Sequence, residues 1–378
     1  MEKNVRSLKE SYPGKAYATL KRMGAQPGDD LDDGSFSLLE HLEANLTNKE
    51  SVDKIAQHFS SISQEFPALN IIHLSETVQA KLKQRMEANL PYVSRYKIEN
   101  MIRKAKKTKS GVPGDLPKIL HKEFGPELAL PLEKIYNGIV QTGQWPDSWK
   151  VEFGLPLKKT ANPLNEDQIR IISLTPSFSK VFERFVISWL MDYLQQHLDW
   201  WQYGGQKGTS VTHYLIDFIN FISYNQDLRN MHAVLAVIID FSKAFNRINH
   251  AKVIVRLSDW GVPGWLLKIL VSYPTDRSMI IRYKGVQSSR HFMPGGSPQG
   301  ALLGVLLYLV YVSDIGMDLP IIRQPVPDTI DLPSVTFPPT PAVTEQEARL
   351  KYVDDLSLAE CVRLDTNLCS LEDQSGPR

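Results

Sequence analysis

The sequence predicts a mixed α+β protein, and two observations support that fold class. Up to about residue 230 the apolar residues recur at helical spacing, most clearly over Phe178–Leu194. From Ala233 onward the period changes: the apolar run 233–239, rich in β-branched residues, is typical of a strand, and further short strands follow between helical segments. The 378 residues, 42% of them hydrophobic and 22% charged, have an ordinary globular composition, which excludes a wholly disordered or fibrous chain.

The overall charge does not by itself indicate a polyanionic partner, since 43 Lys and Arg face 42 Asp and Glu. The two cysteines, Cys361 and Cys369, cannot build a disulfide framework, so we expect a reducing compartment. The longest apolar run, Ala301–Val312, is too short to span a bilayer, and the N-terminus lacks the apolar core of a signal peptide. We therefore expect an intracellular protein without membrane association.

The N-terminal part, residues 1–91, is predicted to be a helical extension or linker, with one amphipathic helix marked by Ile55, Phe59, Ile62 and Phe66. A basic run follows, and its five cations are Arg103, Lys104, Lys106, Lys107 and Lys109. A solvated helix face, a localisation signal and a nucleic-acid contact are all open for this run.

The remaining elements are predicted from period and turn chemistry. The expected helices are 178–194, 211–221, 251–260, 265–273 and one from Ser297 as N-cap and Pro298 as first residue through Ala301–Val312. The expected strands are a buried one at 233–239, a pair at 279–283 and 286–292, and a pair at 350–353 and 356–359. Residues 320–347 are rich in proline and predict an exposed insert, and 361–378 a polar tail.

Three carboxylates are the strongest chemical candidates. Asp240 closes a predicted strand, and Asp354 and Asp355 form the predicted turn of a hairpin. If these strands are neighbours in one sheet, the carboxylates converge at one edge and call for hard cations, with Mg²⁺ the preferred ion. Asp240 could instead cap a helix, and Asp pairs are common in turns because short polar side chains satisfy turn backbone groups.

Four strings occur together in a recognisable order. They are Arg170–Leu174 (RIISL), Ile239–Phe245 (IDFSKAF), Gly296–Gly300 (GSPQG) and Tyr352–Asp355 (YVDD). In this order they resemble the reverse transcriptase of non-LTR (LINE-type) retrotransposons, over roughly Tyr92–Glu360. The resemblance implies a right-hand polymerase with fingers at 92–232 and a palm at 233–360. It also implies an RNA template, a DNA primer and dNTPs as partners, with the oligomeric state left open.

The resemblance assigns roles to individual positions. Asp240, Asp354 and Asp355 would be the catalytic residues and would hold two Mg²⁺ ions, with Mn²⁺ as a substitute. Substrate contacts would come from Phe245, Gln299, Gly300, Arg170 and Lys158. Phe245 would lie against the 2′ position of the sugar and favour dNTPs, whereas plain core packing is the alternative. Nucleic-acid contacts would come from Arg103, Lys104, Lys106, Lys107, Lys109 and Lys207, for which solvated surface charge is the alternative.

The match also has departures. Gln206 and Thr209 stand where relatives usually carry arginines, which weakens the expected phosphate contacts at that turn. Only 23 residues follow Asp355, too few for the rest of a palm and a thumb, so we expect an absent thumb and weak processive synthesis. A catalytically inactive remnant that keeps the fold and binds RNA or DNA is the second hypothesis. An interaction protein that docks through its proline-rich insert is the third. The resemblance slightly favours the nucleus over the cytoplasm.

Overall fold

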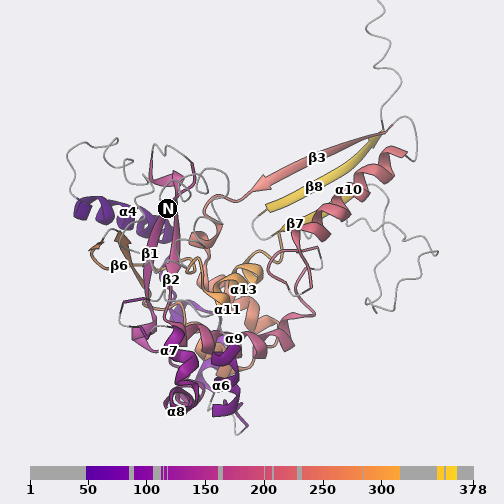
Figure 1. Ribbon diagram of the computed structural model, residues 1–378. Helices are drawn as coiled ribbons and strands as arrows, with labels where there is room; N and C mark the ends of the chain where they lie inside the picture. The colour runs from indigo at the N-terminus through magenta and orange to yellow at the C-terminus, as the bar shows by residue number, and fades with distance from the viewer. Residues whose placement is uncertain are drawn as a thin grey trace, which may run out of the picture. The chain divides into compact units, whose positions relative to one another are not determined.

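The chain is described by a computed structural model (Figure 1). It covers residues 48–84, 89–104, 112–113, 115–116, 118–160, 165–199, 201–206, 208–227, 232–283, 285–315, 347–352 and 355–363. The described residues fall into two compact units. Unit 1 lies within Met1–Leu194 and Phe245–Tyr308, and unit 2 within Gln195–Ala244 and Leu309–Arg378. Both contain helices and strands, so the predicted mixed α/β class is confirmed.

Unit 1 is built on a mixed sheet with the order β2-β1-β4-β5, and β6 also pairs with β4. The strands are β1 (Val151–Lys158), β2 (Ile169–Leu174), β4 (Ser278–Tyr283), β5 (Val286–Gln287) and β6 (His291–Phe292). β1 runs antiparallel to β2 and parallel to β4. One face of this sheet is buried: every second residue of β2 packs inward, namely Ile169, Ile171 and Ser173.

Helix α4 (Asn48–Ser63) covers that buried face. Its apolar stripe and the inward residues of the sheet form one core, whose members are Val52, Ile55, Ala56, Phe59, Ile62, Ile169, Ile171, Met279, Ile281 and Met293. The helix predicted from residues 55–66 is thus present, and it is part of the unit 1 core.

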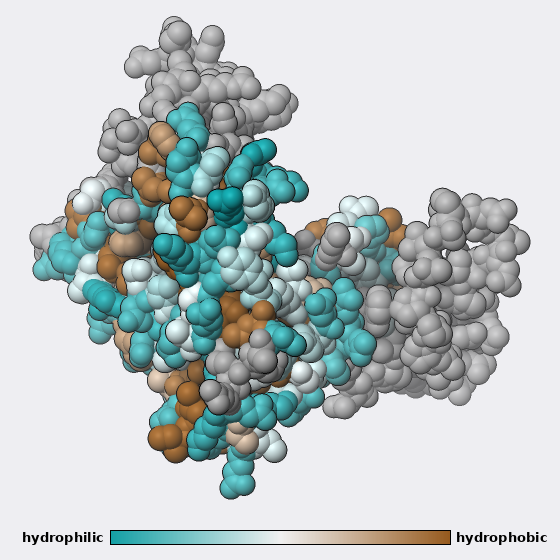
Figure 2. All heavy atoms as spheres, turned by 90° about the horizontal axis from the view of Figure 1, so that it is seen from below, coloured by the Kyte–Doolittle hydropathy of each residue, from teal (hydrophilic) through white to brown (hydrophobic). Residues whose placement is uncertain are grey.

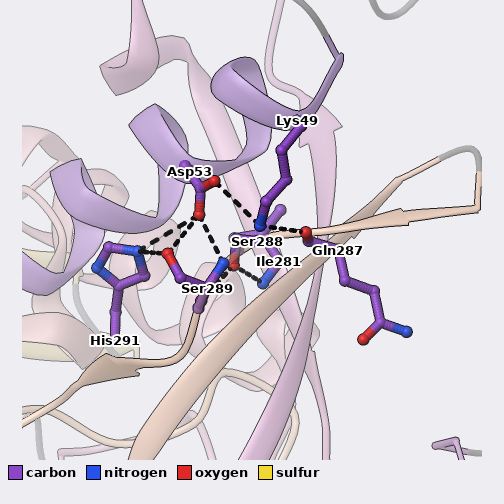
Figure 3. A network of polar contacts seen from close by, with 7 residues as sticks. All are labelled: Lys49, Asp53, Ile281, Gln287, Ser288, Ser289 and His291. Atoms are coloured by element: carbon purple, nitrogen blue, oxygen red, sulfur yellow. Dashed lines mark hydrogen bonds and ion pairs between the residues drawn. The ribbon is translucent and has the colours of Figure 1, made fainter.

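A polar network fixes the start of α4 to the turn between β5 and β6 (Figure 3). Asp53 accepts hydrogen bonds from the backbone N and the hydroxyl of Ser289, both at 2.5 Å, and forms an ion pair with Lys49 at 3.1 Å. Burial alone would raise the pKa of Asp53, but these hydrogen bonds and the lysine outweigh it and lower the pKa to about 2. The carboxylate therefore stabilises this junction in its ionised form.

The rest of unit 1 is helical. Its helices are α5 (Glu76–Lys83), α6 (Arg95–Lys104), α7 (Lys118–Glu123), α8 (Gly125–Thr142), α9 (Ser177–Leu194), α11 (His250–Asp259), α12 (Gly264–Ser272) and α13 (Leu302–Tyr311), the last of which runs on past Tyr308. Short 3₁₀ turns lie at Ile71–His73, Asp147–Trp149, Glu166–Gln168 and Ala244–Arg247. Aromatic rings join these helices: Trp145 contacts Phe182 and Tyr273 at centroid distances of 5.3 and 4.9 Å.

Unit 2 is an antiparallel sheet with the order β3-β8-β7 and one helix against it. β3 (His232–Asp240) pairs with β8 (Asp355–Arg363) along its whole length, and β8 forms a hairpin with β7 (Glu347–Tyr352). Helix α10 (Val211–Asp227) packs on β3 and β7, with Phe221 at the centre of a small apolar cluster. In Figure 1 the three strands form one layer, and α10 lies against it as a second layer.

An ion pair fastens the segment before α10 to β7. Lys351 Nζ lies 2.8 Å from Asp199 Oδ2, and both side chains are only 5% exposed. The backbone of Lys351 also bonds to Trp201 and Tyr203 at 2.7 and 2.8 Å. Asp199, Trp201 and Tyr203 are therefore held beside β7 by main-chain and side-chain contacts together.

The structure corrects several predicted elements. The strand predicted as buried at 233–239 is the edge strand β3, in which Val237 and Ile238 are 48% and 67% exposed. The single strand predicted at 286–292 is two short strands, with Ser288 bonded to Ile281 and the exposed Ser289 bonded to Asp53 between them. The hairpin predicted with Asp355 in its turn has Asp355 as the first residue of β8, paired with Tyr352.

Part of the predicted organisation lies outside the described residues. This applies to residues 1–47 of the N-terminal extension, to 316–346 of the proline-rich insert and its flank, and to 364–378 of the tail. The predicted boundaries between fingers and palm stay a prediction. Along the described part of the chain, no helix combines the length and the apolar character needed to cross a bilayer. On the face shown in Figure 2, apolar side chains are exposed in small groups among hydrophilic ones, as is ordinary for globular proteins.

Candidate functional site

One candidate position, within unit 2, is the end of the sheet where β3 stops and β8 starts. Asp240 is the last residue of β3, and its Cα partner across the ladder is Asp355, the first residue of β8. Asp355 also pairs with Tyr352 of β7, so only Val353 and Asp354 connect the two strands of the hairpin. Two of the three predicted carboxylate residues thus share one register position, and the third is adjacent to it in sequence.

The local sequence explains this register. Residues 233–239 are apolar and largely β-branched, which favours an extended chain, and Asp240 ends the run. The side chain of Asp240 is exposed, which suits a carboxylate that meets a ligand or solvent. Asp354 lies outside the described residues, and for Asp355 the backbone position is described.

Carboxylate oxygens at one end of a sheet are ligands of the type that hard divalent cations prefer, so the residue types fit Mg²⁺ or Mn²⁺. Among the side chains that the structure describes, no group of three or more His, Cys, Asp or Glu lies close enough to hold a metal ion. The fit of this position to metals therefore rests on the ladder pairing of Asp240 with Asp355 and on their donor chemistry.

Another candidate, described within unit 1 alone, is the loop Gly295–Gly300, which contains Gln299. Its backbone is pinned from two sides. Ser297 N donates to Phe245 O at 2.7 Å and Gly296 N to Ile248 O at 3.0 Å, while Ser173 N of β2 donates to Gln299 O at 2.9 Å. The loop therefore links the segment that follows β3 in the chain with strand β2.

Glycine is required at both ends of this loop. Gly296 has φ +79°, and a Cβ there would lie 2.8 Å from the carbonyl oxygen of Asn246. Gly300 has φ +135°, and its Cβ would lie 2.6 Å from the carbonyl oxygen of Ser173. Side chains are therefore excluded by backbone strain and by close approach together. The small residues predicted to matter here do allow the backbone to come close to its neighbours.

The helix after the loop does not begin where the sequence predicts. Ser297 and Pro298 lie in the loop, and α13 starts at Leu302, because the positive φ of Gly300 interrupts helical geometry. The cap comes from Glu183 of α9: its Oε2 accepts from Leu302 N at 2.8 Å and Leu303 N at 3.1 Å. A carboxylate on another helix thus satisfies the first free N–H groups of α13.

Glu183 is fully buried, and burial raises its pKa, while the two backbone hydrogen bonds and the charge of Arg277 oppose that rise. His250 also holds the loop: its Nε2 lies 2.6 Å from Gly296 O. Burial lowers the pKa of His250, so the ring is neutral near pH 7 and donates this hydrogen bond.

A small cavity, lined by both polar and apolar residues, lies beside the loop. Its volume is about 20 Å³, enough for about one water molecule, and its lining includes Glu152, Arg277 and Gln299. Burial raises the pKa of Glu152, and the positive charge of Arg277 partly offsets that effect. Glu152 Oε2 and Arg277 Nε and Nη2 are buried without a hydrogen-bond partner among the described atoms. The loop therefore lies next to two buried charged side chains, Glu152 and Arg277.

Phe245 is half-buried beside the loop. Its ring lies 5.0 Å from that of Tyr308 on α13, at an interplanar angle of 31°. The alternative of core packing for Phe245 is therefore present in part, against α13. Its backbone carbonyl meanwhile accepts from Ser297.

The two predicted cations of the β1–β2 hairpin lie on opposite faces. Arg170 is exposed and pairs with Leu157, on the face that also carries Leu155 and Ile172. Lys158 pairs with Ile169, and strand alternation puts it on the face that α4 covers. The structure thus does not bring these two predicted substrate-binding residues together.

Only part of the predicted nucleic-acid surface can be located. Arg103 and Lys104 are exposed at the end of α6, and Arg103 forms an ion pair with Glu99. Lys106, Lys107, Lys109 and Lys207 lie outside the described residues.

Gln206 and Thr209, at the turn where relatives usually carry arginines, bond within the turn. Gln206 donates to Asp199 O at 2.9 Å, and the Thr209 hydroxyl donates to Tyr203 O at 2.6 Å. These two side chains close the turn.

Sequence reasoning missed Glu152, Glu183, His250 and Arg277, the buried polar groups under and beside the loop. A signal existed for Glu183, which lies in line with Ser179, Val186 and Leu190 on the buried side of an otherwise apolar helix. A charged residue on the core side of an amphipathic helix indicates a buried partner.

Residues 157–359 match the family described as reverse transcriptase (RNA-dependent DNA polymerase). The RNA-directed DNA polymerase from mobile element jockey of Drosophila melanogaster is 26% identical over 280 residues, which are 72% of this chain and 30% of that protein. The probable RNA-directed DNA polymerase from transposon BS of the same species is 31% identical over 189 residues, 49% of this chain and 20% of the relative.

A third relative is the putative 115 kDa protein in type-1 retrotransposable element R1DM, 23% identical over 69% of this chain and 22% of its own length. The chain thus spans under a third of each of these relatives. The family match, residues 157–359, covers more than half of the chain. It includes Asp240, the Gly295–Gly300 loop and Asp355. The predicted resemblance is confirmed, and the chain belongs to the reverse transcriptase family.

Proposed function

We propose that this chain carries the nucleotidyl-transfer site of an RNA-directed DNA polymerase. The observation that carries the proposal is the ladder pairing of Asp240 with Asp355, which sets two carboxylate residues opposite each other at one end of a sheet. The adjacent Asp354 would supply a third carboxylate. The family match and the names of the relatives support the same reaction class.

Asp240, Asp354 and Asp355 are proposed to hold two divalent ions, Mg²⁺ or in its place Mn²⁺. When bound, the ions lower the pKa of the attacking primer 3′-hydroxyl and offset charge on the leaving phosphate. The carboxylates themselves would bind the ions and fix their position, and the side chain of Asp240 is exposed to solvent and accessible for that purpose.

The loop Gly295–Gly300 is proposed to meet the template and the incoming dNTP through Gln299 and Gly300. Its backbone hydrogen bonds to Phe245, Ile248 and Ser173 hold it in one conformation, which reduces the entropy lost when a substrate binds. Phe245 is proposed to exclude the 2′-hydroxyl of ribonucleotides, with Tyr308 fixing the position of its ring.

The finer description as a right hand, with fingers at 92–232 and a palm at 233–360, is part of this proposal. So are Arg170 and Lys158 as substrate contacts and the cations of the basic run as template contacts. Because Arg170 and Lys158 lie on opposite faces of the hairpin, they would serve different ligands or different parts of one ligand. The nucleus is proposed as the compartment, ahead of the cytoplasm, and imaging of the tagged chain in cells tests it.

The test is primer extension on an RNA template with dNTPs, in Mg²⁺ and separately in Mn²⁺. We expect the wild-type chain to add at least one nucleotide. Asp240→Asn and Asp355→Asn should each lower the rate by about a hundredfold or more, since each removes charge that holds the ions. Asp259→Asn, at the exposed end of α11, is the matched control and should stay within about twofold.

The second candidate function is a catalytically inactive remnant that binds RNA or DNA. A folded wild-type chain that binds the primer–template duplex but adds no nucleotide in either metal would establish it and refute the catalytic proposal. Incorporation that survives in both Asn variants would show that these carboxylates are not the site.

A further inference from the structure

We propose that the exposed face of α6 in unit 1 binds a single strand of nucleic acid by stacking unpaired bases on Tyr92 and Tyr96. This face, called here the α6 face, consists of Tyr92, Arg95, Tyr96, Lys97, Arg103 and Lys104, all of them exposed. The inference rests on the proposed function and deepens it: Arg103 and Lys104 are already proposed as template contacts, and Tyr92 and Tyr96 are added as rings on which bases stack.

Exposure of the two rings is the first observation. Tyr92 and Tyr96 are 65% and 66% exposed, whereas Ile98 and Ile102 on the opposite side of α6 are buried. The helix therefore packs through its isoleucines and presents its tyrosines to solvent. Large aromatic side chains left this open are the platforms on which nucleobases stack, because every base has a π face.

The rings are held in place by contacts with α8. Asn137 bonds to both the N and the O of Val93 at 2.9 Å, which fixes the backbone next to Tyr92. Glu133 accepts from Arg95 N at 2.7 Å. A hydrogen bond from the Tyr92 hydroxyl to Glu133 raises the pKa of Tyr92. Tyr92 thus offers an exposed ring whose hydroxyl is already fixed, which lowers the entropy lost on binding.

Positive charge accompanies the rings. Arg95 lies over the ring of Tyr96, with Cζ 4.9 Å from the centroid, and donates to the Tyr96 hydroxyl at 2.9 Å. The face holds Arg95, Lys97, Arg103 and Lys104 against the nearby carboxylates Glu99 and Glu133, so its net charge is positive. Phosphate groups are the complementary charge, and arginine next to an aromatic ring suits a stacked base.

The dimensions also suit a short strand. Tyr96 and Arg103 are separated by two turns on the same side of α6, or about 10 Å at 1.5 Å per residue. That distance corresponds to about three steps of a stacked strand at 3.4 Å each. A base on Tyr96 would therefore bring a phosphate of the same strand within reach of the Arg103 end.

The test is fluorescence anisotropy with a short, unstructured, labelled RNA, in a buffer without divalent metal or dNTPs. Tyr92→Ala and Tyr96→Ala should each weaken binding by about fivefold or more, and the double variant more strongly. Tyr→Phe variants should stay within about twofold, because stacking does not require the hydroxyl. Leu130→Ala on α8, another exposed apolar side chain at 49%, is the matched control and should have no effect.

Three further arms separate the sources of affinity. Single-stranded DNA of the same sequence should bind similarly, whereas an abasic strand should bind the wild type as weakly as the double alanine variant does. A strand carrying 2-aminopurine should lose fluorescence on binding the wild type, which reports stacking even if an alanine variant fails to fold. Because the buffer contains neither divalent metal nor dNTPs, a failed primer-extension assay leaves this result unaffected.

Alanine variants that bind RNA within about twofold of the wild type, or an unchanged 2-aminopurine signal, would overturn the proposal. If the abasic strand binds with the same affinity, the α6 face attracts only phosphates. That result would also overturn the proposal. Absence of any nucleic-acid binding by the folded chain would point to a protein partner for this surface instead.

Discussion

Replacing Glu183 tests whether one buried carboxylate sets the position of the Gly295–Gly300 loop. Glu183→Ala removes the acceptor for Leu302 N and Leu303 N, at 2.8 and 3.1 Å, and for the Ser179 hydroxyl at 3.3 Å. Because α13 begins at Leu302, the substitution removes its N-terminal cap.

The expected loss of stability follows from the two backbone N–H groups that lose their acceptor. Each buried N–H that loses its acceptor costs about 1–3 kcal/mol. Leu303 is fully buried and bears that cost, whereas the partly exposed Leu302 regains solvent and bears less of it. Removal of a desolvated carboxylate, whose pKa is raised by burial, returns part of the loss. We therefore expect a decrease of about 3 kcal/mol in the free energy of unfolding of unit 1.

Glu183→Gln is the matched control. It keeps an oxygen acceptor of the same shape, so we expect a loss of about 1 kcal/mol or less. It also removes a titrating group. Since the folded-state pKa of Glu183 is above its unfolded value, the stability of the wild type relative to the Gln variant should be largest at acid pH. It should then fall as the pH rises above about 4.5.

The assay is urea unfolding followed by tryptophan fluorescence, with the midpoint compared at unchanged slope. Primer extension on the same samples reports whether the loop has moved. A loss below about 1 kcal/mol for the Ala variant, or equal losses for Ala and Gln, would refute the cap as the reason why Glu183 is buried.

Three other substitutions follow from the same structure. Gly300→Ala should destabilise unit 1 by about 2 kcal/mol or more in urea unfolding, because φ +135° is unfavourable and the Cβ would lie 2.6 Å from Ser173 O; no loss would refute the close approach. Asp53→Asn should cost about 1 kcal/mol at pH 7 after solvent screening, and the difference should vanish as the pH falls from about 4 to about 2 in acid-unfolding experiments, because the pKa of Asp53 is lowered. Lys351→Met should cost about 3–5 kcal/mol in thermal or urea unfolding of unit 2, and the added change Asp199→Leu should recover much of it; additive losses would show that the buried pair is not coupled.

Much of the local structure could be predicted from sequence because period and turn chemistry act over short distances. The helix over 178–194 carries one long apolar face, and the structure has α9 over the same span. The hairpin around Asp354 was predicted from two short apolar runs and is present as β7 and β8.

The misses came from contacts between distant residues. Ser297 and Pro298 favour a helix start in isolation, but Gly300 adopts a positive φ and Glu183 supplies the cap from another helix. An apolar run such as 233–239 indicates a strand but not its place in the sheet, so the exposed edge position of β3 could not be predicted.

For the candidate site, too, local patterns could be predicted and contacts between distant residues could not. Asp240 and the Asp pair were predicted to share a sheet edge, and the ladder pairing of Asp240 with Asp355 is what that prediction requires. Arg170 and Lys158 were grouped by resemblance, although strand alternation places them on opposite faces. The face on which a strand residue lies depends on the register of the strand. A shift of one residue moves every side chain to the other face, and the sequence does not fix the register that closely.

The ladder between β3 and β8 has a consequence for how the protein folds. Residues 241–354 separate these paired strands along the chain, so the ladder has a high contact order, and chain-closure entropy opposes it until late in folding. During synthesis β3 emerges with its apolar Val237 and Ile238 well before β8, a wait of about ten seconds at ordinary elongation rates. The strand that ends in Asp240 therefore keeps an unpaired backbone edge in the nascent chain until β8 is made, and such an edge is what a chaperone protects.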